Sequence, residues 1–205
     1  MVKEKTLKVG FDLDGVLLYN PARIARPVIT LMKKKKVITN RQELEFYVPK
    51  PGFEQFFWEL LHKSSICLAP GFEQIVELKK AKIVEPYLIT GRFAHLQKNY
   101  DKWRKKMKAD QLFVQSYMNS NDEQPHLFKE KLIRELELDY FIEDNWDIVQ
   151  YLDQRFAKTK GQDKSATIIW LSNILDFRVD YHSKVMSLQE ALTILTRANT
   201  DSQRR

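Results

Sequence analysis

Short apolar runs that alternate with helical patterns constrain the fold of this chain more than any other feature. Between these runs, apolar residues recur three and four positions apart, as they do on one face of a helix. Strands that alternate with helices form a parallel sheet, joined by right-handed crossovers and covered on both faces. The sequence therefore predicts a doubly wound, Rossmann-type α/β fold. The expected strands span 7–13, 83–90, 111–115, 140–142 and 166–171, and the expected helices span 71–80, 95–108, 129–136, 148–156 and 187–198. Pro86 argues against strand structure in the first half of 83–90, because proline has no N–H for a sheet ladder.

One stretch does not fit the alternation. About fifty residues separate the first expected strand from the helix at 71–80, whereas an ordinary strand–helix loop has roughly 2–6 residues. The stretch contains helix-like segments at 21–36 and 51–62, so we expect a small helical cap at 18–69, over the carboxyl end of the first strand. The core then comprises 1–17 and 70–198, and 199–205 form a flexible polar tail.

The expected cap is also the most basic part of the chain. Residues 17–69 contain nine Lys and Arg residues against four acidic ones, whereas the whole chain has a net charge of +7. We expect Arg23 and Arg26 to contact an anionic ligand, and the run Lys33 to Lys36 to be a solvated helix end. The charge alone leaves a phosphate-bearing substrate, nucleic acid and a solvated surface open as interpretations.

Composition excludes several classes of protein. Hydrophobic residues make up 43% of the 205 residues, too many for a disordered chain. The single cysteine, Cys67, excludes an internal disulfide and a cysteine-based zinc site. No run approaches the ~18 apolar residues of a membrane span, and we expect no secretory leader, so a cytoplasmic location is the expectation.

Two carboxylates follow the first expected strand. Asp12 and Asp14 lie two residues apart where the strand ends, so both side chains point to the same side. Gly15 then allows the backbone to turn sharply. The carboxyl ends of parallel strands are where ligands bind, and two repelling carboxylates favour a cation such as Mg²⁺ between them. The alternative is an Asp-x-Asp-Gly turn whose acids only cap a loop.

Two further strand ends carry polar residues. Thr90, Gly91 and Arg92 follow one apolar run, and Glu143 and Asp144 follow another, with Asp147 close behind. Lys129 begins the helix that precedes the acidic pair. Because the carboxyl ends of parallel strands meet at one edge of the sheet, these groups are expected to lie near Asp12 and Asp14.

In these motifs the chain resembles the haloacid-dehalogenase-like hydrolases. Their first motif, Asp-x-Asp-x-Thr/Val, corresponds to Asp12-Leu13-Asp14-Gly15-Val16; the second, a Ser or Thr at a strand end, to Thr90; the third, a Lys, to Lys129; and the fourth, an acidic pair, to Glu143-Asp144. The resemblance covers roughly residues 7 to 178. Within the family, the segment from Lys129 to Asn145 is most similar to nucleotidase-like phosphatases.

The resemblance implies a mechanism and a role for each of these residues. Asp12 would be the nucleophile that forms an aspartyl-phosphate, and Asp14 the general acid and base. Mg²⁺ would be held by Asp12, Asp144 and the backbone carbonyl of Asp14. Thr90 and Lys129 would bind the phosphoryl oxygens.

Several residues keep two interpretations. Glu143-Asp144 departs from the usual Asp-Asp or Gly-Asp, so Asp144 is the expected metal ligand, while a role for Glu143 or Asp147 stays open. Gly91 and Arg92 are expected to contact substrate phosphate, although a surface Arg paired with an acid fits Arg92 equally. Lys131 competes with Lys129 for the role of the motif lysine, and the spacing to the next strand favours Lys129.

His95 is expected to be an ordinary helix-surface histidine. The aromatic residues of 51–62 have helical spacing and predict a cap core rather than a base-stacking surface: Phe53, Phe56, Phe57 and Trp58.

Taken together, the sequence predicts a Mg²⁺-dependent phosphatase that acts on a small phosphorylated metabolite, such as a nucleotide. The basic charge also permits a phosphatase that acts on nucleic-acid ends. A binding protein that keeps the fold without catalysis is the third alternative, and the intact pair Asp12 and Asp14 argues against it.

Overall fold

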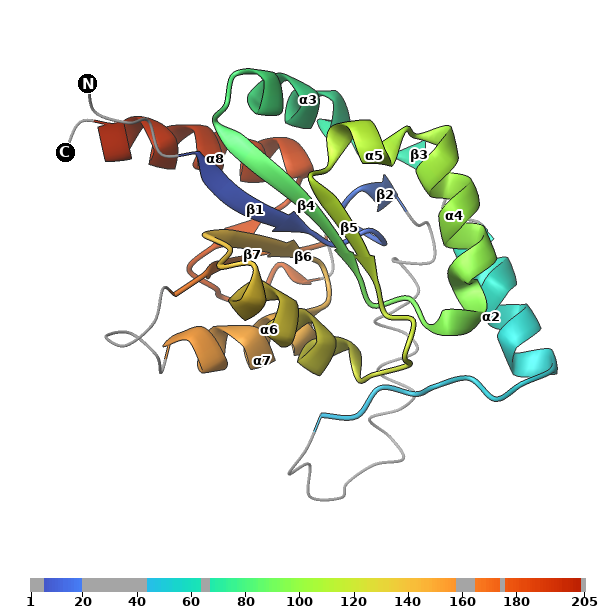
Figure 1. Cartoon of the computed structure of the whole chain (residues 1–205). Coiled ribbons are helices and arrows are strands. Elements are labelled where there is room, and N and C mark those ends of the chain that lie inside the picture. Colours follow the sequence, from blue (N-terminus) through green and yellow to red (C-terminus); the bar gives the residue numbers. More distant parts are fainter. Residues whose placement is uncertain (1–5, 20–43, 64–66, 158–164, 174–175, 204–205) are drawn as a thin grey trace.

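The computed structural model describes residues 6–19, 44–63, 67–157, 165–173 and 176–203. Its centre is a parallel six-stranded sheet in the order β5-β4-β1-β6-β7-β8 (Figure 1). β1 lies between β4 and β6 and pairs with both. The predicted parallel α/β architecture is confirmed. The strands are β1 (Leu7–Phe11), β4 (Val84–Thr90), β5 (Gln115–Met118), β6 (Tyr140–Glu143), β7 (Thr167–Leu171) and β8 (Lys184–Val185).

Helices cover both faces of this sheet (Figure 1). On one face lie α3 (Phe72–Lys80) and α8 (Leu188–Gln203), and on the other lie α6 (Pro125–Glu135) and α7 (Trp146–Ala157). Each face buries its own apolar cluster, which includes Phe11 on the α3 and α8 side and Phe141 on the α6 and α7 side. Alternating strand residues thus supply both cores, and the ends of β1, β4 and β6 are fixed between two packed layers. Between β4 and β5 lie the 3₁₀ helix η2 (Ala94–Leu96) and the helices α4 (Gln97–Lys106) and α5 (Ala109–Leu112).

The segment inserted after β1 contains one described helix, α2 (Phe53–Lys63), which packs beside α4 (Figure 1). A two-stranded antiparallel ribbon, β2 (Leu18–Tyr19) and β3 (Cys67–Leu68), joins the two ends of the insertion. Ahead of α2, the backbone of Phe46 is hydrogen-bonded in both directions to the side chain of Gln124 (2.7 and 3.3 Å), next to the start of α6. The insertion is therefore tied to the core at several points along its length.

The sequence predicted two helices in the insertion, at 51–62 and at 21–36. The expected helix at 51–62 is present as α2, but its phenylalanines do not form a core: Phe53 is 81% exposed, Phe56 62% and Phe57 49%, while Trp58 is half-buried. The prediction of a cap core there was wrong for the part of the chain that the structure describes. The expected helix at 21–36, with Arg23, Arg26 and Lys33 to Lys36, lies outside the described residues.

The edge strand β5 begins later than expected. Residues 109–112 form the short helix α5, whose Ala109 and Leu112 are buried in the core, and the strand starts at Gln115. The prediction of a strand at 111–115 was wrong because the apolar side chains there meet the core from a helical turn.

Pro86 lies inside β4, contrary to expectation. Its carbonyl accepts a hydrogen bond from the Val114 backbone amide (2.8 Å), so the backbone of Pro86 faces the β5 side of the strand. β5 begins only at Gln115, and the missing N–H of Pro86 therefore interrupts no ladder within the sheet.

The last helix, α8, continues to Gln203, beyond the expected end at residue 198, and Asn199 is buried. Residues 199–203 of the expected flexible tail are therefore helical. Across the described residues, no helix combines the length and the apolar character that a membrane crossing requires.

Candidate active site

Three neighbouring strands bring polar side chains to one edge of the sheet. Asp12 and Asp14 follow the end of β1, Thr90 is the last residue of β4, and Glu143 is the last residue of β6, with Asp144 next. All five are buried, none more than 9% exposed. The order β4-β1-β6 places the carboxylates of β1 between the other two strand ends.

Lys129 connects two of these carboxylates. Its Nζ lies 2.9 Å from Asp12 Oδ1 and 2.6 Å from Glu143 Oε2, and its side chain is 3% exposed. Burial alone disfavours the charged ammonium, but the two carboxylates outweigh it, so the pKa of Lys129 is raised and the residue stays cationic. Lys131, the competing candidate, is exposed to solvent.

The single ammonium does not balance the negative charge around Asp12. Burial raises the pKa of Asp12 well above its ordinary value; Lys129 opposes this rise, while Glu143, Asp144 and Asp14 add to it. Among the residues that the structure describes, this site has four buried carboxylates and two buried cationic side chains, Lys129 and Arg92. A divalent cation would remove the remaining excess of charge.

The same carboxylates could hold such a cation. One carboxylate oxygen each from Asp12, Glu143 and Asp144 lie within 4.8 Å of one another. Both oxygens of Glu143 are already engaged, one by Lys129 and the other by the backbone N–H of Asn145 (3.0 Å). The oxygen chemistry of these three side chains fits Mg²⁺.

Gly15 allows Asp144 to approach the end of β1. Its φ is +90°, and a Cβ at this position would lie 2.1 Å from Asp144 Oδ2. A side chain at residue 15 would thus displace the carboxylate and strain the backbone. Asp147, by contrast, lies exposed in the first turn of α7, outside the buried cluster.

Asp14 has a different set of partners. Arg92 donates from Nε to Asp14 Oδ2 (2.6 Å) and from Nη2 to Oδ1 (2.7 Å), and it also donates from Nη1 to Asn99 Oδ1 (2.9 Å). Nε2 of His62, on α2, lies 3.9 Å from Asp14 Oδ2. Arg92 is thus paired with an acid, but in a buried position instead of at the surface.

Thr90 and Gly91 shape the end of β4. The hydroxyl of Thr90 accepts a hydrogen bond from the backbone N–H of Arg92 (3.3 Å), and Thr90 is 1% exposed. A Cβ on Gly91 would lie 3.0 Å from Cβ of Pro125, so the small residue lets the start of α6, and with it Lys129, come close to β4.

Solved structures share this arrangement of elements. The magnesium-bound HAD-hydrolase YfnB of Bacillus subtilis is 13% identical, with 94% of this chain and 99% of that chain covered and a TM-score of 0.57. A mutant of CbbY from Rhodobacter sphaeroides, in complex with xylulose-(1,5)bisphosphate, is 15% identical, with coverage of 91% and 96% and a TM-score of 0.54. A HAD-superfamily hydrolase of subfamily IA from Geobacter sulfurreducens is 14% identical, with coverage of 93% and 96% and a TM-score of 0.50. The chain has the haloacid-dehalogenase-like fold. Neither a protein-family profile nor a curated protein matches the sequence.

Two residues that contact Asp14 or Arg92 have no clear signal in the sequence. His62 belongs to the inserted segment, and its position beside Asp14 depends on how α2 packs on α4. Asn99 lies on α4, seven residues beyond Arg92, and its contact with Arg92 depends on how the chain turns between the end of β4 and α4. His95, expected to be an ordinary helix-surface residue, is half-buried; burial lowers its pKa, and both His62 and Glu59 of α2 act on it.

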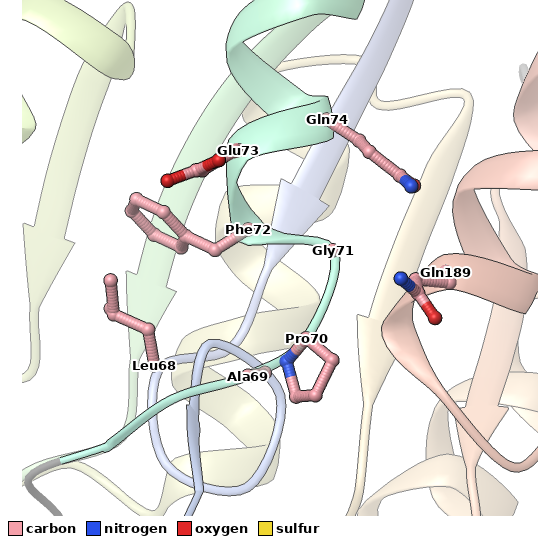
Figure 2. Close-up of a pocket in the computed structure, with 8 residues that line it drawn as sticks. All are labelled: Leu68, Ala69, Pro70, Gly71, Phe72, Glu73, Gln74 and Gln189. Atoms are coloured by element: carbon pink, nitrogen blue, oxygen red, sulfur yellow. The ribbon is translucent and has the colours of Figure 1, made fainter.

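A separate pocket of about 290 Å³ lies where β3 leads into α3 (Figure 2). Gly71 and Gln189 face each other across it, and a Cβ on Gly71, whose φ is +98°, would lie 2.7 Å from Gln189 Cγ. None of the candidate catalytic residues lines this pocket. Gly71 is therefore required for the close approach of α3 to α8, and the pocket is a feature of their packing.

Proposed function

We propose that this protein is a Mg²⁺-dependent phosphatase that hydrolyses a small phosphorylated metabolite through an aspartyl-phosphate. The observation that carries the proposal is the position of Asp12. It lies buried at the end of the central strand, 2.9 Å from the Lys129 ammonium and within the acidic group formed with Glu143 and Asp144. A carboxylate held between a fixed cation and a cation-binding cluster is arranged for attack on a phosphoryl group.

Asp12 attacks phosphorus with one carboxylate oxygen, and the bond from phosphorus to the ester oxygen breaks. Lys129 and the hydroxyl of Thr90 bind the oxygens of the transferring group, because negative charge develops there. Asp12, Asp144 and the backbone carbonyl of Asp14 would hold Mg²⁺, which would supply further positive charge beside the transferring group.

Asp14 moves the protons. It gives a proton to the departing ester oxygen, and it then takes a proton from the water that hydrolyses the aspartyl-phosphate. Both transfers require the Asp14 carboxyl group to contact the substrate side of the site. Its position two residues after Asp12 favours this, since both side chains leave the strand on the same side.

Two resemblances suggest which substrates to test. The solved CbbY complex contains a sugar bisphosphate, and the segment from Lys129 to Asn145 is similar to nucleotidase-like phosphatases, so phosphorylated sugars and nucleotides are the first substrates to examine. We also propose that the protein acts in the cytoplasm. The division into a core at 1–17 and 70–198 and a cap at 18–69 belongs to the same proposal.

The direct test is hydrolysis of p-nitrophenyl phosphate with Mg²⁺ and with EDTA. We expect turnover with Mg²⁺ and its loss in EDTA, restored when Mg²⁺ is added back. A subsequent screen would compare phosphorylated metabolites with phosphate-ended oligonucleotides. Absence of Mg²⁺-dependent turnover on every phosphomonoester would refute the proposal, and turnover restricted to oligonucleotide ends would replace the metabolite with nucleic acid.

A further inference from the structure

The contact between Arg92 and Asp14 restricts the proposed acid. Two nitrogens of one guanidinium hydrogen-bond to the two oxygens of Asp14, at 2.6 and 2.7 Å. Such a bidentate pair is among the strongest and most directional contacts of a carboxylate. In the reaction proposed above, one of these oxygens has to reach the ester oxygen of the substrate. The pair therefore represents the free protein, and it has to rearrange when substrate binds.

Arg92 cannot simply move into water when Asp14 turns away. The residue is 4% exposed, and its third contact, Asn99 Oδ1 at 2.9 Å, is a neutral amide oxygen. A buried guanidinium that loses its carboxylate without replacement is strongly destabilising. The bound state therefore needs another anion close to the place that Asp14 leaves.

We propose that Arg92 exchanges Asp14 for an anionic group of the substrate, so that the site selects phosphomonoesters whose leaving group carries a second carboxylate or phosphate. The inference rests on the proposed phosphatase function and specifies its substrate class. The second anion lies a few bonds from the ester oxygen, because Asp14 and Arg92 are in direct contact and Asp14 serves that oxygen. His62 approaches the same carboxylate from α2, which places this part of the substrate between the core and the inserted helix.

The test compares substrates of nearly equal size. Phosphoglycolate carries a carboxylate beside the ester, 2-hydroxyethyl phosphate carries a neutral hydroxyl, and ethylene glycol bisphosphate carries a second phosphate. For the wild type we expect kcat/KM to be at least about tenfold higher for one or both anionic esters than for the neutral one. Comparison of phosphoglycolate with ethylene glycol bisphosphate shows whether the site prefers a carboxylate or a phosphate as the second anion. Arg92→Met should bring the ratio of kcat/KM for the anionic and the neutral ester close to one. Arg92→Lys keeps the positive charge but cannot form two parallel hydrogen bonds, so it should give an intermediate ratio.

Two controls accompany these variants. Lys98→Met changes an exposed cation on α4 and should leave the ratio at the wild-type value. Calorimetry on Asp12→Asn, with and without Arg92→Met, measures binding of the same compounds in the absence of turnover. The preference for the anionic compounds should be present in the single variant and absent from the double one. Arg92→Lys also covers the case in which Arg92→Met does not fold.

The outcomes separate the two claims. If the wild type hydrolyses p-nitrophenyl phosphate but shows no preference, or keeps its preference in Arg92→Met, the exchange is refuted and the phosphatase stands. If turnover is absent but binding shows the Arg92-dependent preference, the anion site stands and the phosphatase is refuted. Absence of both refutes both.

Discussion

The sheet edge and the inserted helix α2 differ in how they hold their side chains. At the sheet edge, Lys129 and Arg92 are nearly inaccessible and contact their carboxylates at 2.6–2.9 Å. On α2, Phe53 and Phe56 are more than half exposed, and Nε2 of His62 lies 3.9 Å from Asp14 Oδ2. The difference indicates that the chemical groups are fixed by the packed core, and that α2 contributes at the boundary of the site.

The largest effect on activity is expected from a change of Asp12, in the buried cluster at the sheet edge. Asp12→Asn should lower kcat on p-nitrophenyl phosphate by about a thousandfold or more, because an amide is a poor nucleophile toward phosphorus. The fold should be retained, since the amide is nearly the same shape. Asp147→Asn, a change at an exposed position, should keep kcat near the wild-type value. Activity of Asp12→Asn within tenfold of wild type would exclude covalent catalysis by this residue.

Lys129→Met tests whether the contacts at the sheet edge also stabilise the fold. It leaves Asp12 and Glu143 buried without their shared cation, so the free energy of unfolding should fall by about 3–5 kcal/mol. Denaturant unfolding in EDTA measures the change. The exposed Lys131→Met is the matched control, with an expected change within about 0.5 kcal/mol. Equal losses for the two variants would show that the Lys129 contacts contribute little.

The comparison between neighbouring acids can be sharpened by a metal titration. Asp144→Ala should raise the Mg²⁺ concentration for half-maximal activity by about tenfold or more, and by more than Glu143→Ala does. The reason is that both oxygens of Glu143 are already hydrogen-bonded, to Lys129 and to the Asn145 amide. Asp147→Ala should have almost no effect. A larger shift for Glu143→Ala would mean that Glu143, and not Asp144, is the principal ligand.

A pair of phenylalanines compares the two regions by stability alone. Phe11, in β1, is fully buried, and Phe11→Ala should cost about 3–5 kcal/mol. Phe53, on α2, is 81% exposed, and Phe53→Ala should change the free energy of unfolding by less than about 0.5 kcal/mol. Both are measured by denaturant unfolding. A loss of several kcal/mol for Phe53→Ala would show that this face of α2 is covered in solution.

The parts of the site that follow the sheet were accessible from the sequence. Apolar runs predicted the strands, and the period of two predicted that Asp12 and Asp14 leave β1 on the same side. Because the ends of parallel strands meet at one edge, the sequence could also bring Thr90 and Asp144 to the same place.

Other features depend on packing that no local pattern encodes. The bidentate contact of Arg92 with Asp14 joins residues 78 positions apart, and the approach of His62 depends on how the inserted helix lies on α4. Helical spacing predicted a buried face for the aromatic residues of α2, because spacing indicates which side chains share a face but not what covers that face. The two-residue strands β2 and β3 are too short for an alternating pattern to appear.

The most direct test of the central claim is detection of the aspartyl-phosphate itself. The wild type, mixed with Mg²⁺ and acetyl phosphate labelled with radioactive phosphorus and then quenched in acid, should retain label that is lost at alkaline pH, as an acyl phosphate is. Peptide mapping should locate the label at Asp12, Asp147→Asn should be labelled like the wild type, and Asp12→Asn should carry no label. A wild type that turns over phosphomonoesters without any labelled intermediate, or a label that persists in Asp12→Asn, would contradict the account.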